Sequence, residues 1–522
     1  MLRRSLGVAG AALALVVPAT ASAQLTTTSS TDLTPRVKEY VGTSVALNGT
    51  TRLRVILPTG YAENPTRRYP VLYLLHGAFD DYRSWVDKGF AERVSEPHQM
   101  IIVMPDGGTF GWYANHVNNG PQWETFHIGE LIPWADATFR TKPERSERAI
   151  AGLSMGGHGT AAYSGRHPDL FAAAEAFSGV VNPTQLGPGE NVFGPKTPEN
   201  IARWEGSDGT YLIPNYRTYA HFGLRTGTGQ PGPFDAPTRP VDTLEQSLYA
   251  QNTNMHNKLT AAGIAHTWEE FPGTHTWPYW ERDLGKALPE FQRVFDGDVA
   301  TPAQVNVSLP DNQWTRWGWS VGFDSARPLA WTTLARADAT GFTLTGKGAA
   351  TVKTPAGLYP AGKQYKANGA AVTAAQDGSL TIPVDLGTGS TVAVFVGALS
   401  TELPGTVGGT VPATLSLTLG APATFGTFTP GVEQDYTATT DVTVTSTAGD
   451  AALSATPAGK LTNGAFSLVE PLRVEPAKAA WNGPTSGEKV GVTFKQLVKR
   501  TDPLRTGSYS TTVTFTLSTT NP

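Results

Sequence analysis

The sequence predicts an α/β domain followed by two all-β domains, and three observations favour this arrangement. Up to about residue 297, short apolar runs alternate with helix-like segments, as in a largely parallel sheet flanked by helices. From about residue 300, Thr, Ala, Gly and Val dominate, and short alternating segments are typical of β-sandwiches. A chain of 522 residues also exceeds one ordinary core, so more than one domain is expected.

Short apolar runs between turn residues mark the buried strands of the first domain, residues 24–297. Runs this short fit parallel strands that are covered on both faces, and we place them at 69–75, 100–104 and 148–151. Helical spacing of apolar residues between the second and third runs predicts an amphipathic helix, carried by Ile128, Leu131, Ile132, Ala135 and Phe139. Further strands are expected at 218–223 and 265–271, and helices at 246–262 and 283–294.

The remaining chain is predicted to form two β-sandwich-like domains, residues 298–400 and 412–522. In the first, strands are expected at 349–354, 379–384 and 391–396. Residues 401–411 are rich in Pro, Gly and Thr and are interpreted as a linker. In the second, strands are expected at 413–419, 441–446 and 508–518.

The N-terminus has the pattern of an export signal. Arg3 and Arg4 precede an apolar stretch, and Ala21-Ser22-Ala23 offers the small residues of a cleavage site before Gln24. We therefore expect residues 1–23 to be a signal peptide and the protein to be secreted. The stretch is too short and too rich in small residues to favour a permanent membrane helix.

Composition excludes several classes of function. The chain has no cysteine, which excludes disulfides, thiolate metal sites and Cys nucleophiles. A net charge of −4 lacks the basic excess of a nucleic-acid-binding protein, so no nucleic-acid partner is expected. An aromatic content of 10% is too high for a disordered chain.

Gly152-Leu153-Ser154-Met155-Gly156 fits the Gly-x-Ser-x-Gly nucleophile elbow of the α/β-hydrolase fold. The serine of this motif sits in a strained turn between a strand and a helix, where larger neighbours would collide with backbone. The surroundings fit, because residues 149–151 can form the strand and 157–165 are small enough to pack as a helix on the sheet. Ser154 is therefore the candidate nucleophile.

A serine hydroxyl needs a base and an acid that orients the base. In this fold both follow the nucleophile along the chain. His275, just past the last expected strand, is the candidate base, whereas His266 begins that strand and is interpreted as structural. Sequence position leaves the acid open among Asp235, Asp242 and Glu245, with Glu269 and Glu270 less suited because they lie within the strand.

Two backbone N–H groups are needed to stabilise the oxyanion of an acyl-transfer intermediate. Met155, which follows the nucleophile, is expected to supply one, and Ala78 in the turn Leu75-His76-Gly77-Ala78 the other. His76 is interpreted as a residue that shapes this turn. These groups suffice for acyl transfer, so no metal and no organic cofactor are expected.

Residues 36–295 resemble the esterase-D and secreted mycolyltransferase group of α/β-hydrolases. Four blocks carry the resemblance: residues 75–85 with His76-Gly77, Asp80-Asp81-Tyr82 and Trp85; Trp123-Glu124-Thr125-Phe126; residues 152–157; and residues 273–280 with His275 and Trp277. The resemblance implies a Ser-Glu-His triad, in which Glu245 is the acid, and oxyanion donors at Ala78 and Met155. We also expect Trp85 and Trp277, which belong to the shared blocks, to contact substrate.

Two positions depart from the mycolyltransferases and resemble the broader esterase branch. The mycolyltransferases usually carry Asp where this chain has His76, and often Ser where it has Gly156. The leading hypothesis is therefore a secreted carboxylic-ester hydrolase that forms an acyl-enzyme on Ser154. The alternative is an acyltransferase of the mycolyltransferase or diacylglycerol acyltransferase type, which moves the acyl chain to a sugar or glycerol hydroxyl.

A second alternative is a non-catalytic surface or glycan-binding protein. Trp314, Trp317, Trp319 and Trp331 would then form the binding face, although filling a β-sandwich core is the favoured interpretation. The expected substrate is an ester, such as a lipid or an acylated sugar, and the β-domains are expected to contact the cell envelope or a polysaccharide. We expect residues 24–297 to be an autonomous catalytic unit that the β-domains place. In a rival hypothesis, the first β-domain walls the acyl pocket with Trp317 or Trp319.

Overall fold

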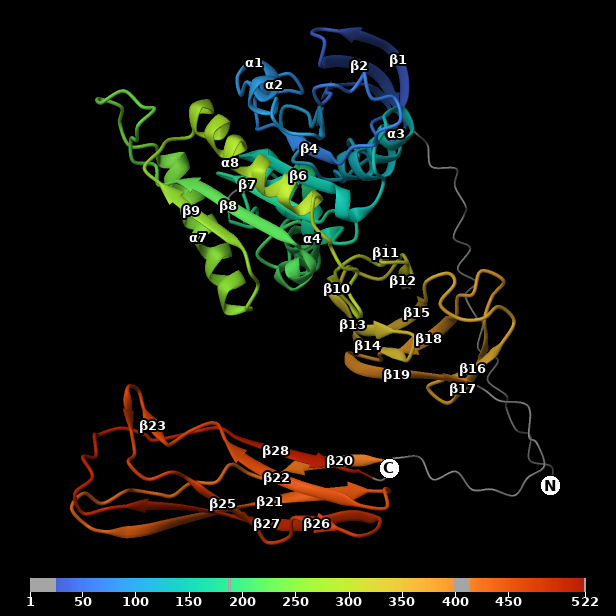
Figure 1. The fold of residues 1–522 in the computed structure, drawn as a ribbon. Helices are drawn as coiled ribbons and strands as arrows, with labels where there is room; N and C mark the ends of the chain where they lie inside the picture. Colours follow the sequence, from blue (N-terminus) through green and yellow to red (C-terminus); the bar gives the residue numbers. More distant parts are fainter. Residues whose placement is uncertain (1–24, 186, 188, 399–413, 521–522) are drawn as a thin grey trace, which may run out of the picture. The chain divides into compact units, whose positions relative to one another are not determined.

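The computed structural model describes residues 25–185, 187, 189–398 and 414–520. It divides into two compact units, residues 1–401 and 402–522 (Figure 1). The predicted signal peptide, residues 1–23, and the predicted linker, residues 401–411, lie outside the described residues. No helix of the described chain is long and apolar enough to cross a membrane.

The first unit contains a nine-stranded sheet in the order β1-β2-β3-β5-β4-β6-β7-β8-β9. Its strands are β1 (Thr26–Asp32), β2 (Val37–Ser44), β3 (Gly49–Ile56), β4 (Val71–Leu75), β5 (Ile101–Pro105), β6 (Arg148–Leu153), β7 (Ala173–Phe177), β8 (His221–Gly227) and β9 (Thr267–Phe271). β1, β2, β3 and β5 pair antiparallel. The six strands from β5 to β9 in sheet order are parallel. The predicted α/β class of the first domain is confirmed.

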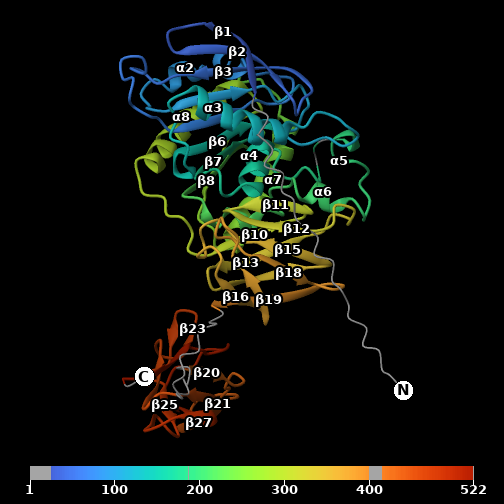
Figure 2. The ribbon, with the colours of Figure 1, turned by 90° about the vertical axis from the view of Figure 1, so that its right-hand side faces the viewer.

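Helices cover both faces of this sheet. They are α1 (Ser84–Asp87), α2 (Ala91–Val94), the π-helical η1 (Thr125–Leu131), α3 (Ile132–Thr138), α4 (Met155–Arg166), α5 (Glu190–Phe193), α6 (Ile201–Glu205), α7 (Thr243–Ala261) and α8 (Trp277–Phe295), with 3₁₀ turns η2 (Arg145–Glu147) and η3 (Ile213–Thr218). Alternate residues of β4 enter two apolar clusters, as the period of a strand requires. The cluster of Leu72 and Leu74 takes in α8, and that of Tyr73 takes in α4 and α7. In Figure 2, α8 lies on one side of the strands β6, β7 and β8, and α4 and α7 lie on the other.

Most predicted elements of the α/β domain are present with shifted ends. The strand expected at 218–223 begins at His221, because Ile213–Thr218 form η3. The helix expected at 283–294 begins already at Trp277, where Pro278 suits a first turn. β1 was not predicted, because its sequence Thr-Thr-Thr-Ser-Ser-Thr-Asp has no apolar alternation and every residue is exposed.

Parallel strands carry the loops at their carboxyl ends to one edge of the sheet. The segments that follow β4, β5, β6, β8 and β9 therefore meet there. They include Gly77-Ala78, the turn at Ser154 and the segment around His275, which is the set that the sequence assigned to the site.

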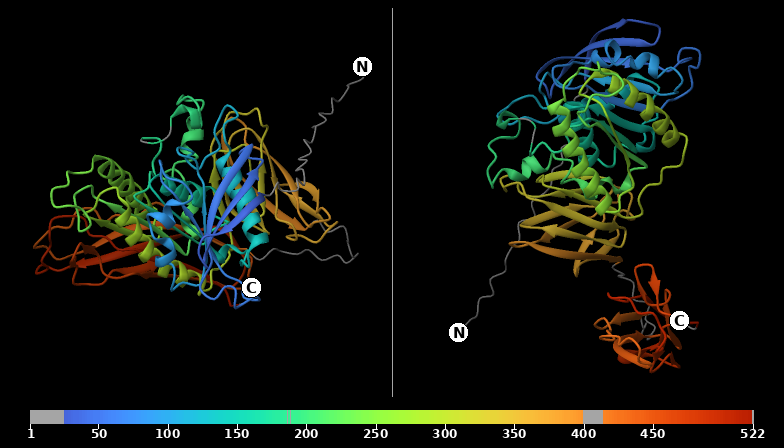
Figure 3. Two further views of the ribbon diagram at one scale, coloured as in Figure 1. Left: turned by 90° about the horizontal axis from the view of Figure 1, so that it is seen from above. Right: turned by 90° about the vertical axis from the view of Figure 1, so that its left-hand side faces the viewer.

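The β-rich remainder of the first unit forms two antiparallel sheets, β10-β13-β14-β19-β16-β17 and β11-β12-β15-β18. Their strands are β10 (Val305–Leu309), β11 (Gln313–Arg316), β12 (Trp319–Gly322), β13 (Thr332–Asp338), β14 (Gly341–Gly346), β15 (Ala349–Lys353), β16 (Gln364–Ala367), β17 (Ala370–Thr373), β18 (Thr381–Asp385) and β19 (Ser390–Ala398). Buried residues of both sheets belong to the same apolar cluster as α4 and α7. This part therefore packs directly on the α/β domain (Figure 3, right).

Charged and polar contacts fasten the same junction. Arg166, at the end of α4, forms ion pairs with Glu124 at 2.8 Å and with Asp311 at 3.0 Å. The Asn215 side chain donates to the Ser308 carbonyl at 2.9 Å and accepts the Ser308 N–H at 2.9 Å. The β-rich remainder of the first unit, residues 305–398, is the first β-region, and these contacts tie it to the end of α4 that lies away from Ser154.

The second unit holds a sheet in the order β20-β21-β27-β25, a second in the order β26-β22-β28, and the hairpin β23-β24. The strands are β20 (Leu415–Leu419), β21 (Gln434–Ser446), β22 (Ala451–Pro457), β23 (Thr462–Asn463), β24 (Phe466–Ser467), β25 (Arg473–Pro476), β26 (Ala480–Trp481), β27 (Thr485–Val498) and β28 (Val513–Ser518). A separate apolar cluster lies within this unit.

Candidate active site

Ser154 occupies a strained turn between β6 and α4. Its backbone has φ 54° and ψ −115°, a conformation that a residue with a side chain adopts only when its surroundings enforce it. The flanking glycines permit the turn. A Cβ at Gly152 would lie 2.4 Å from the Gly156 carbonyl oxygen, and a Cβ at Gly156 would lie 2.4 Å from the Leu75 carbonyl oxygen.

A chain of hydrogen bonds joins Ser154, His275 and Glu245. The Ser154 Oγ lies 2.9 Å from His275 Nε2, and His275 Nδ1 lies 2.6 Å from Glu245 Oε2. Because a carboxylate accepts only, Nδ1 carries the ring proton and Nε2 is the acceptor for the serine hydroxyl. The geometry is that of a nucleophile beside an oriented base.

Glu245 is fully buried in the first turn of α7, and its carboxylate is well supplied with donors. Oε1 accepts the Ser178 hydroxyl at 2.6 Å and the Gly227 N–H at 2.7 Å, while Oε2 faces His275. The helix N-terminus also favours a negative charge at this position. A buried carboxylate is tolerable when its oxygens are bonded in this way.

The other acids that the sequence left open support the site without reaching the imidazole. Asp242 caps α7 by accepting the Glu245 N–H at 3.1 Å, and it accepts the His275 backbone N–H at 3.0 Å. Burial raises the pKa of Asp242, but these two hydrogen bonds, together with the nearby charges of His275 and Arg239, hold the pKa below its ordinary value. Asp235 accepts the Thr274 hydroxyl at 2.6 Å and the Tyr279 hydroxyl at 2.6 Å.

The acids of the last strand and His266 have other partners. Glu269 pairs with Arg225 and Lys286, and Glu270 accepts the Tyr249 hydroxyl at 2.8 Å. His266 lies 2.8 Å from a nitrogen of His256. These residues are not joined to Ser154.

Within the described chain, neither the Met155 amide, which directly follows the nucleophile, nor the Ala78 amide, in the turn after β4, donates a backbone hydrogen bond. A Cβ at Gly77 would stand 3.4 Å from the Ser154 Cβ, so the turn that contains Ala78 touches the serine. Met155 begins α4, where the first N–H groups of a helix have no partner within it. Both amides are thus available to a ligand at Ser154.

The side chain and backbone of His76 hold the turn Leu75-His76-Gly77-Ala78 in place. The Gly107 N–H donates to His76 Nε2 at 2.8 Å, so Nδ1 carries the proton and donates to the Gly77 carbonyl at 2.8 Å. The Tyr113 hydroxyl donates to the His76 carbonyl at 2.9 Å. His76 therefore shapes the turn, as the sequence indicated, and it also ties the turn to the segment after β5.

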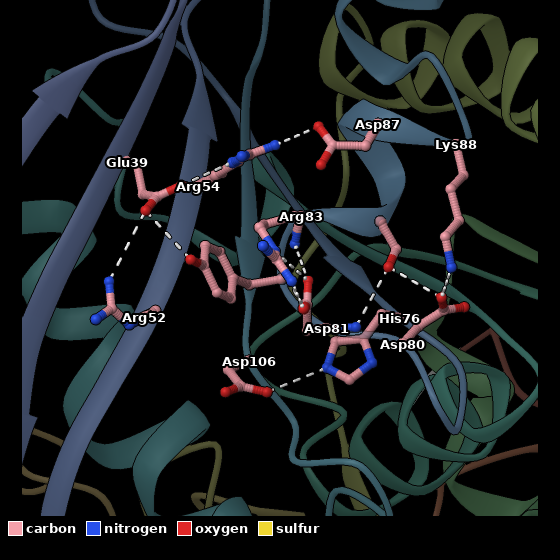
Figure 4. Close-up of polar contacts among 12 residues, drawn as sticks. Glu39, Arg52, Arg54, His76, Asp80, Asp81, Arg83, Asp87, Lys88 and Asp106 are labelled. Atoms are coloured by element: carbon pink, nitrogen blue, oxygen red, sulfur yellow. Dashed lines mark hydrogen bonds and ion pairs between the residues drawn. The ribbon is translucent and has the colours of Figure 1, made fainter.

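Ionic contacts hold the segment that follows the turn (Figure 4). Asp80 pairs with Lys88 at 2.6 Å and accepts the Ser84 hydroxyl at 3.0 Å. Asp81 pairs with Arg83 at 2.6 Å. The shared Asp80-Asp81-Tyr82 block thus stabilises the backbone that leads out of the turn.

Comparison with known proteins shows which family the chain belongs to. The family model described as "Putative esterase" matches residues 44–291. The diacylglycerol acyltransferase/mycolyltransferase Ag85B of Mycolicibacterium smegmatis is 31% identical over 255 residues, which are 43% of this chain and 76% of that protein. The chain belongs to this esterase family.

The chain spans little more than half the length of some curated relatives. The chain is 34% identical to esterase Rv1288 of Mycobacterium tuberculosis over 262 residues, which are 46% of this chain and 56% of the relative. Among solved structures, it is similar to a ferulic acid esterase, with 26% identity, coverage of 50% of this chain and 98% of that chain, and a TM-score of 0.42. It is also similar to MPT51 of Mycobacterium tuberculosis, with 20% identity, coverage of 48% and 96%, and a TM-score of 0.41.

In this esterase-family chain, the two Trp residues expected to contact substrate differ in position. Trp85 is 1% exposed, and its indole N–H donates to the Leu75 carbonyl at 2.9 Å. Trp85 therefore supports the end of β4 from within the core. The expectation that Trp85 contacts substrate is corrected, because its side chain is buried. Trp277 is half-buried and packs edge-on against Trp85 at 5.3 Å, two residues beyond His275.

Sequence reasoning missed the residues that position the site. Ser178 and the Gly227 amide hold Glu245, and Tyr113 holds the turn at His76. For the acids, the sequence did carry one signal: Asp242-Thr-Leu-Glu245 has the spacing of a helix-capping pair, which predicts that both residues lie at the start of one helix. Among the described residues, no three His, Asp or Glu side chains gather as metal ligands.

Proposed function

We propose that the protein is a serine carboxylic-ester hydrolase. The proposal rests on the hydrogen-bonded chain from Ser154 through His275 to Glu245, located at the strained turn of an esterase-family chain. Each residue type suits its task. A serine hydroxyl is a poor nucleophile alone, and an imidazole held in one tautomer is a general base within reach of its proton.

In the proposed reaction, Ser154 Oγ attacks the ester carbonyl and its proton passes to His275 Nε2. The Glu245 carboxylate accepts the hydrogen bond from the His275 Nδ1–H and stabilises the imidazolium that forms. The Ala78 and Met155 amides bind the oxyanion. The proton on Nε2 then passes to the departing alcohol, leaving an acyl group on Ser154. Water, deprotonated by His275, releases the acid and restores the serine.

Acyl transfer is the second candidate, and the 31% identity to Ag85B favours keeping it. The same residues would act, with a sugar or glycerol hydroxyl in place of water. The two reactions differ in the acceptor that the site holds and in how well it excludes water.

A purely glycan-binding role has less support. Trp314 and Trp319 are buried, and the Trp331 indole donates to Glu205 at 2.7 Å at the junction with α6. The Trp317 backbone N–H donates to the Asp169 carboxylate at 2.9 Å, just beyond the end of α4. Two of the four side chains are thus buried, and the Trp317 backbone is held near the end of α4 that lies away from Ser154.

The experiment combines a probe with product analysis. The purified chain is treated with a fluorophosphonate, which labels an activated serine, and is assayed on short and long acyl esters with and without glycerol and trehalose. Labelling of wild type but not of Ser154→Ala, with release of free acid, supports hydrolysis. Acylated glycerol or trehalose as the main product would favour transfer, and an unlabelled, inactive wild type would refute both.

We also propose that the protein is exported and that its β-regions contact the cell envelope or a polysaccharide. The support is the signal-like pattern of residues 1–23 and the predicted sandwich character of the β-regions. Fractionation of cells that express the full chain, followed by N-terminal sequencing of the exported form, tests export. Retention of the full precursor in the cells would contradict it.

A further inference from the structure

Two phenylalanines stand exposed and in contact beside the candidate oxyanion turn. Phe79 is 80% exposed and Phe110 is 46% exposed. Their ring centroids lie 4.5 Å apart at an interplanar angle of 81°, an edge-to-face pair. Single exposed apolar residues need no explanation, but a paired aromatic surface next to a reactive group is unusual.

The position of Phe79 relative to the nucleophile follows from its neighbours. Gly77 approaches Ser154 so closely that a Cβ on the glycine would lie 3.4 Å from the serine Cβ. Phe79 follows Gly77 by two residues and directly follows Ala78. Because consecutive Cα atoms are about 3.8 Å apart, the Phe79 Cα lies at most about 7.6 Å from the Gly77 Cα and directly follows Ala78, the expected oxyanion donor.

The backbone of Phe79 is held in a conformation that a bulky residue rarely adopts. Its φ is 64°, in the left-handed region. The Phe79 N–H donates to the Thr109 carbonyl at 3.2 Å, one residue before Phe110. The Gly107 bond to His76 fastens the same two segments a second time. The ring is thus placed by a braced backbone, and such strain persists where surrounding contacts enforce it.

We propose that Phe79 and Phe110 form an aromatic subsite that binds a planar aromatic or extended apolar group attached to the scissile ester. The inference rests on the proposed ester chemistry and adds the substrate class. The edge-to-face contact with Phe110 covers only part of the Phe79 ring. Because Phe79 is 80% exposed, the rest of its ring surface is open to a flat group that stacks on it. The group belongs to either the acyl or the alcohol side of the ester, since both flank the carbonyl.

The test compares aromatic and small esters in two arms. Ethyl cinnamate against ethyl acetate varies the acyl side, and benzyl acetate against ethyl acetate varies the alcohol side. Release of acid is followed by pH-stat for wild type, Phe79→Gly, Phe79→Ala and Phe110→Ala. Phe395→Ala is the matched control, because Phe395 is 74% exposed but lies on β19, outside the site.

We expect kcat/KM for the aromatic ester of one arm to fall about tenfold in Phe79→Gly and Phe79→Ala, mainly through KM, with ethyl acetate within about twofold of wild type. The arm that falls identifies the side of the ester. Glycine relieves the positive φ and alanine retains it, so equal losses assign the effect to the ring. Phe110→Ala is expected to show a smaller loss on the same arm, and Phe395→Ala none.

Unchanged ratios in both arms would overturn the subsite while leaving the hydrolase intact. A uniform loss on all esters would also overturn it, because the ring would then act on the turn and not on the substrate. A wild type that hydrolyses no ester and takes no fluorophosphonate label is a different result. It would refute the proposed function, and the subsite with it.

Discussion

The carboxylate of Asp242 accepts the backbone N–H of His275 at 3.0 Å. The imidazole ring of the same histidine is held instead by Glu245, at 2.6 Å. One acid thus fixes the main chain of the proposed base and another its ring. Because both come from the start of α7, a single capping arrangement places them together.

This division of tasks predicts unequal effects of two isosteric substitutions. Glu245→Gln is expected to lower kcat by about 10³–10⁴, because the amide cannot hold the required tautomer or stabilise the imidazolium. Asp242→Asn is expected to lower kcat by about tenfold or less and to destabilise the fold by about 1 kcal/mol through a weaker cap. Steady-state kinetics and urea unfolding of both variants provide the measurement. A larger kinetic loss in Asp242→Asn would reverse the assignment.

Ser154→Ala is expected to abolish ester turnover with little change in stability. The substitution removes only the hydroxyl, and alanine keeps the turn's Cβ and its φ of 54°. Residual activity should fall by at least about 10³, while the unfolding midpoint stays within a few degrees. Ser178→Ala is the control, since its hydroxyl bonds Glu245 but is not a nucleophile; it should retain fluorophosphonate labelling.

The sequence predicted the parts of the site that local pattern encodes. Gly152, Ser154 and Gly156 satisfy a steric requirement that leaves its mark within five residues, and the position of His275 after the last strand follows chain order. Glu245 was less accessible, because position alone allowed three acids and only the resemblance favoured one. The bonds from Ser178 and Gly227 that single it out join the start of α7 to the carboxyl ends of β7 and β8, which only the fold brings together.

Other features depended on tertiary context that no local pattern carries. Trp85 belongs to a block that carries the resemblance, yet in this chain its side chain packs in the core beside the end of β4. The polar strand β1 has no apolar signal, and β7, Ala-Ala-Glu-Ala-Phe, is rich in a residue with low strand preference. The exposed Phe79 ring shows no sequence signal beyond its place after Ala78.

A buried acid predicts how stability depends on pH. Asp283 on α8 is buried, Arg282 bonds its Oδ1, and its Oδ2 has no partner within the described chain. Burial raises the pKa of Asp283 to about 7. The folded state therefore binds a proton that the unfolded state releases near pH 4, so stability declines as pH rises from about 4 to 7.

Asp283→Asn is expected to flatten this decline and to raise the free energy of unfolding at pH 8 by about 1–3 kcal/mol, with little change at pH 4. Urea unfolding at both pH values, followed by tryptophan fluorescence, measures the difference. Asp298→Asn, at an exposed aspartate just after α8, is the control and should change neither value. Equal effects at both pH values would mean that Asp283 is ionised throughout.

The last prediction concerns the junction between the α/β domain and the first β-region. Arg166 bonds Asp311 across it, and Trp317 is bonded to Asp169 just past the end of α4. Because α4 has 12 residues, these contacts lie about 18 Å along the helix from Ser154. A chain that ends at residue 298 should therefore keep near-wild-type turnover of a small soluble ester at low temperature, but it should unfold at a lower temperature.

The reason for the lower unfolding temperature is that truncation at residue 298 exposes an apolar surface shared by the two parts and leaves Arg166 without one partner. Asp311→Asn in the full chain removes only the negative charge that pairs with Arg166. It should lower the free energy of unfolding by about 2 kcal/mol without changing kcat.

A chain that ends at residue 398 keeps the junction and should match the full chain in turnover and in the melting of the first unit. A 298-residue chain that melts like the full protein would mean that the first β-region is a spacer. A folded 298-residue chain without activity would mean that this region completes the site, contrary to the position of Trp317.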